Sequence, residues 1–311
     1  MFLYMEKVSP VVIDGMLPIL LVFLSGFLLA QFNFFSLDAA KEINRMVFFF
    51  GMPLVGISML TKADFSEFNN LLLFSYLFSQ FLTGILGGFL ALYIWKFDLK
   101  SAALVGMSTA LANHLLFILP IAKNIYSGYI IEQISAIIVV DVIVITFIVT
   151  LILEYASAKQ ISLQKLAKRM LSIPLVIGVI IGITLAISNI ELPDVINSFL
   201  DFSYASAAPM ALFALGVTLA KSELMKNPNF IISISLIKVI LHPIFILIIA
   251  LGFFHISVSD LKPALMVAAA PCGAMVLVFA AAYDVDPKPL APLVVISFLL
   301  SLPGVALALL I

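Results

Sequence analysis

Long, almost uninterrupted apolar segments are the feature that most restricts what this chain can fold into. A helix needs about 20 mostly apolar residues to cross about 30 Å of hydrocarbon. Because the segments are continuously apolar and do not alternate, they are typical of membrane helices and not of barrel strands. The predicted spans are 11–32, 43–60, 70–95, 101–127, 133–153, 171–190, 195–220, 230–254, 261–283 and 289–311.

The composition supports a membrane protein and excludes several other classes. Hydrophobic residues make up 64% of the chain and charged residues 11%, whereas soluble domains carry roughly 45–50% and about 25%. A net charge of −1 gives no reason to expect a nucleic-acid partner, and the single cysteine, Cys272, excludes an intramolecular disulfide. The longest polar connection, 154–169, is too short for a soluble domain. We therefore predict an all-α polytopic membrane protein.

The lysines and arginines between the spans predict the orientation in the membrane. Eleven flank the connections after spans 1, 3, 5, 7 and 9: Lys41, Arg45, Lys96, Lys100, Lys159, Lys165, Lys168, Arg169, Lys221, Lys226 and Lys288. Four lie on the other side: Lys7, Lys62, Lys123 and Lys262. Because positive charge stays inside, we expect the connection 154–169 in the cytoplasm and both termini outside it. The expected location is the cytoplasmic (inner) membrane.

The two halves of the chain resemble each other at a shift of 156 residues. This shift superposes Pro18 on Pro174, Gly26 on Gly182, Leu29 on Leu185, Ala30 on Ala186, Asn33 on Asn189, Asp38 on Asp194 and Pro53 on Pro209. A further match, DLKSA (98–102) with DLKPA (260–264), lies at a shift of 162. Five spans per half is an odd number, so the second half enters the membrane from the opposite face. We predict a five-helix repeat over 1–153, a cytoplasmic linker over 154–170 and an inverted repeat over 171–311.

Two spans carry residues that interrupt a membrane helix. Span 4 contains the stretch ALANHLLFILPIAKN (110–124), and span 9 contains Pro271-Cys272-Gly273. Proline removes a backbone donor and glycine tolerates unusual φ angles, so both spans are predicted to be broken helices. Freed backbone groups must be satisfied by side chains, water or ligand. The N-termini of half-helices attract anions, which predicts a binding site at the breaks.

The residues expected to bind substrate lie at these two breaks. They are Asn113, His114, Pro120, Pro271, Cys272, Gly273 and Met275. Asn113 offers both a donor and an acceptor, although it could instead satisfy backbone at a kink. His114 points about 100° away from Asn113 on a helix, so it could bind across helices or titrate near neutral pH. Cys272 is also explained as a small apolar residue.

Three further ionisable residues are candidates for coupling or charge. Asp141 is an acid deep in span 5, a position typical of ion or proton paths. Lys238 in span 8 could neutralise Asp141, attract an anion or extend to the interface. His242 follows Lys238 by four residues and lies on the same helix face. No metal site is expected, because three histidines and one cysteine do not have zinc spacings.

Four patterns in the chain resemble the auxin efflux carrier family, including its bacterial members. They are Asn113 with Pro120-Ile121, Pro271-Cys272-Gly273-Ala274 with Ala280-Ala281-Ala282-Tyr283, Pro209 and Leu212 with Gly216 and Leu219, and Lys238 with His242-Pro243. The resemblance implies that spans 4 and 9 cross at their breaks. It also implies a scaffold of spans 1, 2, 6 and 7, a mobile transport unit of spans 3–5 and 8–10, and a homodimer through the scaffold. The bile acid sodium symporter family is similar in plan.

The chain departs from this family's pattern at two places. Leu115 and Ile118 stand where glycines are usual, and Met275 stands where an amide or hydroxyl residue is common. Both departures make the expected pocket more apolar.

These features predict a secondary transporter of a small organic anion of the carboxylate class that works by elevator-like alternating access. Na⁺ or H⁺ are the coupling ions left open, and no cofactor is expected. A rival prediction is a sodium-coupled symporter of sterol-like or keto-acid anions; another is a non-transporting membrane sensor. We do not expect an enzyme, because no Walker loop, G-x-S-x-G or H-E-x-x-H motif occurs. The expected partners are the anion and the lipid bilayer.

Overall fold

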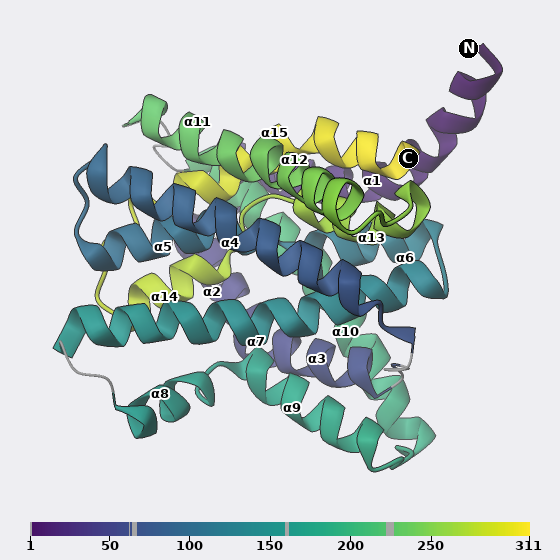
Figure 1. The fold of residues 1–311 in the computed structure, drawn as a ribbon, viewed down its shortest axis with the longest axis horizontal. Helices are drawn as coiled ribbons and strands as arrows, with labels where there is room; N and C mark the ends of the chain where they lie inside the picture. Colours follow the sequence, from purple (N-terminus) through teal and green to yellow (C-terminus); the bar gives the residue numbers. More distant parts are fainter. Residues whose placement is uncertain (1, 62, 64–66, 159–161, 222–226) are drawn as a thin grey trace.

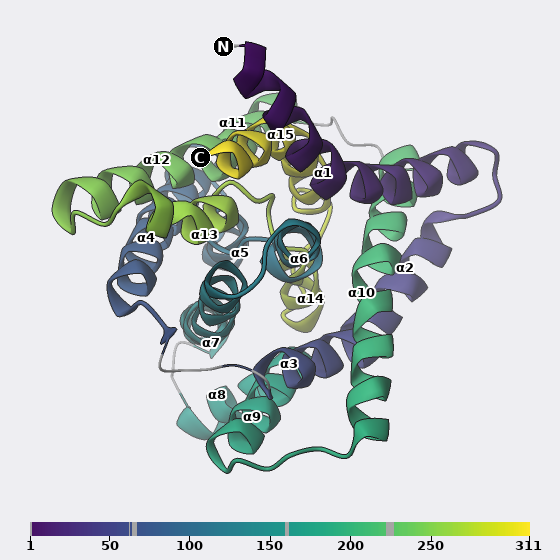
Figure 2. The ribbon, with the colours of Figure 1, turned by 90° about the vertical axis from the view of Figure 1, so that its right-hand side faces the viewer.

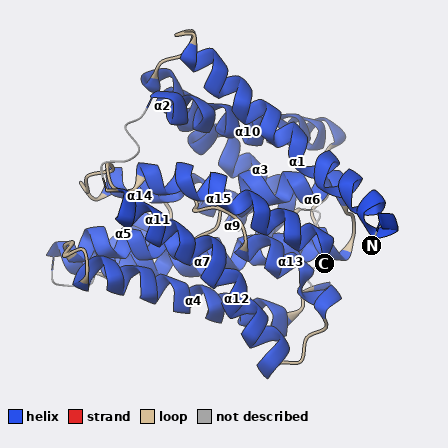
Figure 3. Cartoon of the chain, turned by 90° about the horizontal axis from the view of Figure 1, so that it is seen from above, coloured by secondary structure: helices blue, strands red, loops and turns tan. Residues whose placement is uncertain are grey.

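The computed structural model describes residues 2–61, 63, 67–158, 162–221 and 227–311. Over these ranges its regular elements are all helices, as Figure 3 shows, which confirms the predicted all-α class. The α-helices are α1 (Phe2–Gln31), α2 (Leu37–Met46), α3 (Met52–Leu60), α4 (Asn70–Tyr93), α5 (Leu99–Ala110), α6 (Leu119–Ile125), α7 (Tyr129–Ala158), α8 (Leu163–Met170), α9 (Pro174–Ile187), α10 (Asp194–Lys221), α11 (Pro228–Leu236), α12 (His242–Leu247), α13 (Val258–Ala268), α14 (Met275–Ala282) and α15 (Ala291–Leu310).

Seven helical segments of the described chain are long and apolar enough to cross a membrane. Their number rises to eight if α8 and α9, which meet at 83°, form one span. The predicted spans 101–127 and 261–283 are each divided into two short pieces, α5 with α6 and α13 with α14. The chain is therefore a multi-span membrane protein whose fourth and ninth predicted spans are discontinuous.

The helices form two groups that pack against each other. In one group α10 packs against α1, α2 and α3, and α3 packs against α9. The other group contains α4 to α7 and α11 to α15, with α4, α5 and α7 side by side. Figure 2 shows α10 along one edge of the molecule with the second group beside it, and Figure 1 shows α9 below α7.

Glycines allow very close helix contacts in the first group. A Cβ atom on Gly216 of α10 would lie 2.0 Å from the carbonyl oxygen of Phe23 on α1, and one on Gly26 would lie 2.1 Å from that of Phe213. At the contact of α3 with α9, a Cβ on Gly178 would lie 2.2 Å from the carbonyl oxygen of Pro53. Small residues at such interfaces let membrane helices pack backbone to backbone.

The ends of α1 and α9 have the same local structure. Asn33 and Asn189 both adopt positive φ, 62° and 51°. The next residue of each segment donates its N–H to the carbonyl five residues earlier: Phe34 to Leu29 at 2.9 Å and Ile190 to Leu185 at 3.0 Å. Asparagine tolerates this left-handed conformation and ends helices for that reason.

The DLKSA and DLKPA stretches, in contrast, do not occupy equivalent positions. Asp98 is the N-cap of α5, and its side chain accepts from the N–H of Ser101. In α13 the N-cap is Ser257, and Asp260 lies in the first turn. The match at a shift of 162 therefore does not reflect equivalent helix starts.

Three prolines follow stretches of π-helix. The stretches Val47–Gly51, His114–Ile118 and Ile237–Leu241 each end two residues before a proline, Pro53, Pro120 and Pro243 respectively. Because proline has no N–H and clashes with the preceding turn, a wider turn accommodates it without ending the helix. Pro120 therefore lies inside a helix, six residues beyond the start of His114–Ile118, and the interruption of span 4 lies before it.

The expected linker 154–170 is largely helical where it is described. Helix α7 continues to Ala158, and α8 covers Leu163–Met170 with Ser162 as its N-cap. Glu154, placed in that polar linker by the prediction, is a buried residue of α7. The linker boundary at 154 was therefore wrong, because the polar sequence continues the amphipathic end of a long helix.

The close contact of α1 with α10 leads to a stability prediction. We expect Gly216→Ala to lower the free energy of unfolding by about 1–3 kcal/mol, because an overpacked contact must separate to admit the methyl group. The matched control is Gly252→Ala, where a Cβ meets no atom within 4 Å. Thermal unfolding of both variants in detergent, followed by circular dichroism, checks this. Equal melting temperatures for the two variants would contradict it.

Candidate functional site

The two interrupted spans cross at their breaks. Ala112 and Cys272 form an isolated antiparallel bridge. The N–H of Asn113 donates to the carbonyl of Pro271 at 2.9 Å, and the N–H of Gly273 donates to that of Leu111 at 2.9 Å. The predicted crossing of spans 4 and 9 is present, and each break supplies hydrogen-bond partners to the other.

Side chains from two other helices satisfy further backbone groups at the crossing. Ser297 of α15 accepts from the N–H of Cys272 at 3.0 Å. Gln80 of α4 donates to the carbonyl of Ala110 at 3.1 Å. Buried backbone groups away from water need such partners. Gly273 suits this place because a Cβ there would approach the Leu111 side chain to 3.1 Å and the Ala112 carbonyl oxygen to 3.2 Å.

Two helix N-termini begin next to the crossing. The helix His114–Ile125 begins directly after Asn113, and α14 begins at Met275, directly after Ala274. Neither Asn113 nor Ala274 caps its helix with a side-chain hydrogen bond. The half-buried Asn113 side chain also makes no hydrogen bond to any residue that the structure describes. In the first turn of α14 the N–H groups of Val276 and Leu277 donate to the carbonyls of Gly273 and Ala274. The N–H of Met275 and the amide of Asn113 are available to bind an anion.

The remaining predicted residues of the break lie where the sequence suggested. Cys272, Gly273 and Met275 are buried, and His114 is 3% exposed. Pro271 lies in the break itself, whereas Pro120 lies in α6. Pro120 thus shapes the helix beyond the site and does not create the interruption.

Asp141 is fully buried and is surrounded by hydrogen-bond donors. Its carboxylate accepts from Nε2 of Gln80, from the hydroxyl of Tyr76 at 3.4 Å and from Nε2 of His114 at 2.8 Å. Figure 1 shows the helices that provide this cluster, with α4 and α7 side by side. Asp141 therefore contacts the first residue after the break in span 4.

Lys238 lies in a second buried group on the π-helical stretch Ile237–Leu241. Its Nζ lies 2.8 Å from Nδ1 of His242 and 3.4 Å from the carbonyl oxygen of Ala268, close to the break in span 9. Its exposed fraction is 0%. Among the described residues Lys238 forms no direct salt bridge with Asp141, and its buried Nζ does not extend to the interface. Instead, the rings of Tyr76 and His242, 5.3 Å apart, connect the two groups.

Tyr76 and Gln80 were missed by the sequence analysis. Gln80 is an amide in the middle of an apolar span, a signal that could have marked it, whereas Tyr76 carries no such signal. Gln80 also lines an apolar pocket of about 320 Å³ between α4, α5 and α7, together with Gly84, Gly88 and Gly106.

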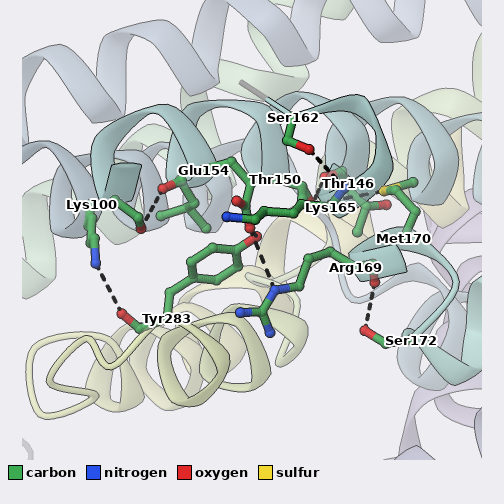
Figure 4. Close-up of polar contacts among 12 residues, drawn as sticks. Lys100, Thr146, Thr150, Glu154, Ser162, Lys165, Arg169, Met170, Ser172 and Tyr283 are labelled. Carbon is green, nitrogen blue, oxygen red and sulfur yellow. Dashed lines mark hydrogen bonds and ion pairs between the residues drawn. The ribbon is translucent and has the colours of Figure 1, made fainter. Parts of the chain in front are cut away.

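A separate cluster of polar contacts joins α7 and α8 to Tyr283, at the C-terminal end of α14 (Figure 4). Glu154 accepts from the hydroxyl of Tyr283 at 3.0 Å and pairs with Nε of Arg169 at 3.5 Å. The guanidinium of Arg169 lies 5.0 Å from the centre of the Tyr283 ring. The Nζ of Lys100 donates to the Tyr283 carbonyl at 3.5 Å. In the described residues no group of three or more His, Cys, Asp or Glu side chains could hold a metal ion.

Fold and site together define a multi-span membrane protein in which two discontinuous spans cross beside buried polar side chains. This arrangement is typical of transporters. The model of the family described as "Membrane transport protein" matches residues 11–309, and the chain belongs to this family. The resemblance to the auxin efflux carrier family is thereby confirmed.

One curated relative links this family to an organic acid. The chain is 30% identical over 141 residues to a protein of Rhizobium meliloti (strain 1021) named "Putative malonate transporter". The alignment covers 45% of this chain and 44% of that protein, so the chain spans less than half of the relative's length.

The Glu154 cluster gives a testable consequence. We expect Tyr283→Phe to lower the free energy of unfolding by about 0.5–1.5 kcal/mol, because a buried carboxylate loses one hydrogen-bond donor. The control is Tyr155→Phe, whose hydroxyl forms no hydrogen bond with the described residues. Thermal unfolding in detergent measures both. A Tyr283→Phe variant as stable as the control would show that the contact does not stabilise the fold.

Proposed function

We propose that this protein is a secondary carrier that moves a small organic anion, a carboxylate, across the cytoplasmic membrane. The observation that carries the proposal is the crossing of two broken spans. Two helix N-termini and the unpaired side chain of Asn113 meet there. Such N-termini favour negative charge, and an amide adds a donor and an acceptor.

Two further findings agree with an anionic substrate. Lys238 is a buried cation that donates hydrogen bonds to His242 and to a backbone carbonyl. The name of the Rhizobium meliloti relative specifies malonate, a dicarboxylate, as that protein's substrate. We infer that Asn113, His114 and the N–H groups at the start of α14 contact the carboxylate, and that Cys272, Gly273 and Met275 shape an apolar wall.

We further propose that the chain consists of ten spans in two inverted five-helix repeats. Seven long helices, the bent pair α8–α9 and the two discontinuous spans add up to this number. The matching ends of α1 and α9 at Asn33 and Asn189 support the repeat. The surplus of lysine and arginine after odd-numbered spans supports termini outside the cytoplasm.

Alternating access would occur by movement of one helix group against the other. The glycine contacts of α1 with α10 and of α3 with α9 suit a rigid scaffold. The group that holds the crossing meets this scaffold through apolar side chains, such as Phe298 of α15 against Phe23 of α1 at 4.6 Å between ring centres. Apolar surfaces can slide without breaking many directed bonds. The crossing would then move as one body.

Transport by purified protein in liposomes tests the proposal. We expect saturable exchange of labelled malonate, or of another acid from a panel of mono- and dicarboxylates, and Asn113→Ala should weaken it about 10- to 100-fold. That loss corresponds to one hydrogen bond to a charged group, about 1.5–3 kcal/mol. The control is Asn44→Ala on α2, an exposed position.

The outcomes separate the alternatives. If no acid in the panel is exchanged, the carrier proposal fails, and binding without flux would favour a sensor. Full exchange by Asn113→Ala would place the site elsewhere. Exchange that requires sodium on the loaded side would favour the sodium-coupled symporter.

A further inference from the structure

The pair formed by His114 and Asp141 has an unusual arrangement of hydrogens. Gln80 and Tyr76 donate to Asp141, so its oxygens act as acceptors in both bonds. A carboxylate only accepts, so Nε2 of His114 carries the hydrogen of the 2.8 Å bond. In the neutral ring, Nδ1 is then a bare acceptor. This atom is buried and has no hydrogen-bond partner in the described residues.

Protonation of His114 would leave the hydrogen bonds of Asp141 in place. A proton on Nδ1 turns His114 into an imidazolium that keeps its bond to Asp141, and the carboxylate keeps its other two donors. A buried cation is costly unless an opposite charge lies beside it, and Asp141 supplies that charge at hydrogen-bond distance. The site is therefore built to hold one additional proton.

The balance of buried charge favours a proton that travels with the anion. Asp141 and Lys238 are both fully buried and carry opposite formal charges, so together they are neutral. An anion bound at the crossing would leave the moving group with excess negative charge, which is expensive inside a membrane. One proton on His114 removes one unit of that excess.

The surrounding groups leave His114 as the residue with an open proton-accepting atom beside the crossing. Asp141 of α7, Tyr76 of α4, Lys238 and His242 of span 8 and Cys272 of span 9 are the ionisable neighbours of this network. Nδ1 of His242 accepts from Nζ of Lys238, so the hydrogen of the neutral ring is on Nε2. The unpaired Nε2 of His242 is therefore a donor and not an open acceptor. The ionisable residues of the neighbouring helices α10 and α13 have partners of their own. On α10, the ring of Tyr204 lies against Nζ of Lys123, and Asp201 accepts from Ser58. On α13, Asp260 accepts from Ser257, and Lys262 donates to Tyr126.

We propose that His114, held by Asp141, binds the coupling proton of this carrier. His114 is the first residue after the break, next to Asn113, so proton and anion would bind to neighbouring residues of one broken helix. The proton comes from water on the loading side, adds to the lone pair of Nδ1, and leaves to water on the other side. This inference rests on the proposed anion transport and specifies its coupling ion as H⁺.

The test uses liposomes that contain the full chain and labelled malonate as the first probe. Potassium and valinomycin hold the membrane potential at zero while a pH gradient is imposed. For one proton per anion, an inward gradient of about one pH unit should accumulate the anion about tenfold over its equilibrium distribution. A pH-sensitive dye inside the liposomes should report acidification that requires malonate outside.

His114→Gln is the informative variant, because glutamine can still donate to Asp141 but cannot take a proton. We expect it to lose both the accumulation driven by the pH gradient and the internal acidification that accompanies malonate entry. The matched control is His255→Asn, an exposed histidine with positive φ, a conformation that asparagine tolerates. This control should accumulate malonate as the wild type does.

The results separate the two levels of the proposal. Wild-type exchange without any effect of the pH gradient and without internal acidification would overturn the proton site and leave the carrier intact. Accumulation by His114→Gln equal to the wild type would also overturn it. Absence of exchange of every acid in the panel would overturn the carrier proposal itself. The dye measurement on the wild type decides the question even if the variant does not fold.

Discussion

The backbone pairing of Ala112 with Cys272 is the interaction on which the rest of the structure depends. A broken helix inside a membrane leaves N–H and C=O groups that lipid cannot satisfy. Here each break satisfies part of the other, and Ser297 and Gln80 satisfy one further backbone group each. Because this crossing holds both breaks in place, the helices that start at His114 and Met275 begin at one point in the interior.

A buried polar network adjoins the crossing and connects it to three further helical segments. Asp141 of α7 binds the first residue after one break, and Lys238 binds a carbonyl just before the other. Tyr76 contacts both groups. Such networks are stabilising only when most of their groups are paired. The unpaired atoms of this network, Oε1 of Gln80, Nδ1 of His114 and Nε2 of His242, are therefore the places where binding has most to gain.

The sequence predicted the helical class and the two breaks, because proline, glycine and asparagine in an apolar span have few structural explanations. The crossing of the two breaks was implied by the resemblance to the auxin efflux carrier family. The sequence did not predict the partners of Asp141. Gln80 and Tyr76 lie some 60 residues earlier in the chain, and nothing local shows which side of α4 faces α7. The polar stretch from Glu154 was misread as a linker, since burial by Tyr283 and Arg169 comes from segments distant in sequence. Pro120 correctly predicted that span 4 is interrupted. The π-helical stretch before it accommodates the proline within a helix, however, and the break lies at residues 111–113.

Cys272 provides the most direct test of the central claim, that the crossing is the substrate site. It is the single cysteine of the chain and is fully buried at the crossing. The measurement is the rate at which N-ethylmaleimide inactivates malonate exchange in liposomes, with Cys272→Ala as the resistant control. The account predicts inactivation of the wild type that a saturating transported anion slows several-fold. An inactivation rate unchanged by the anion would contradict it.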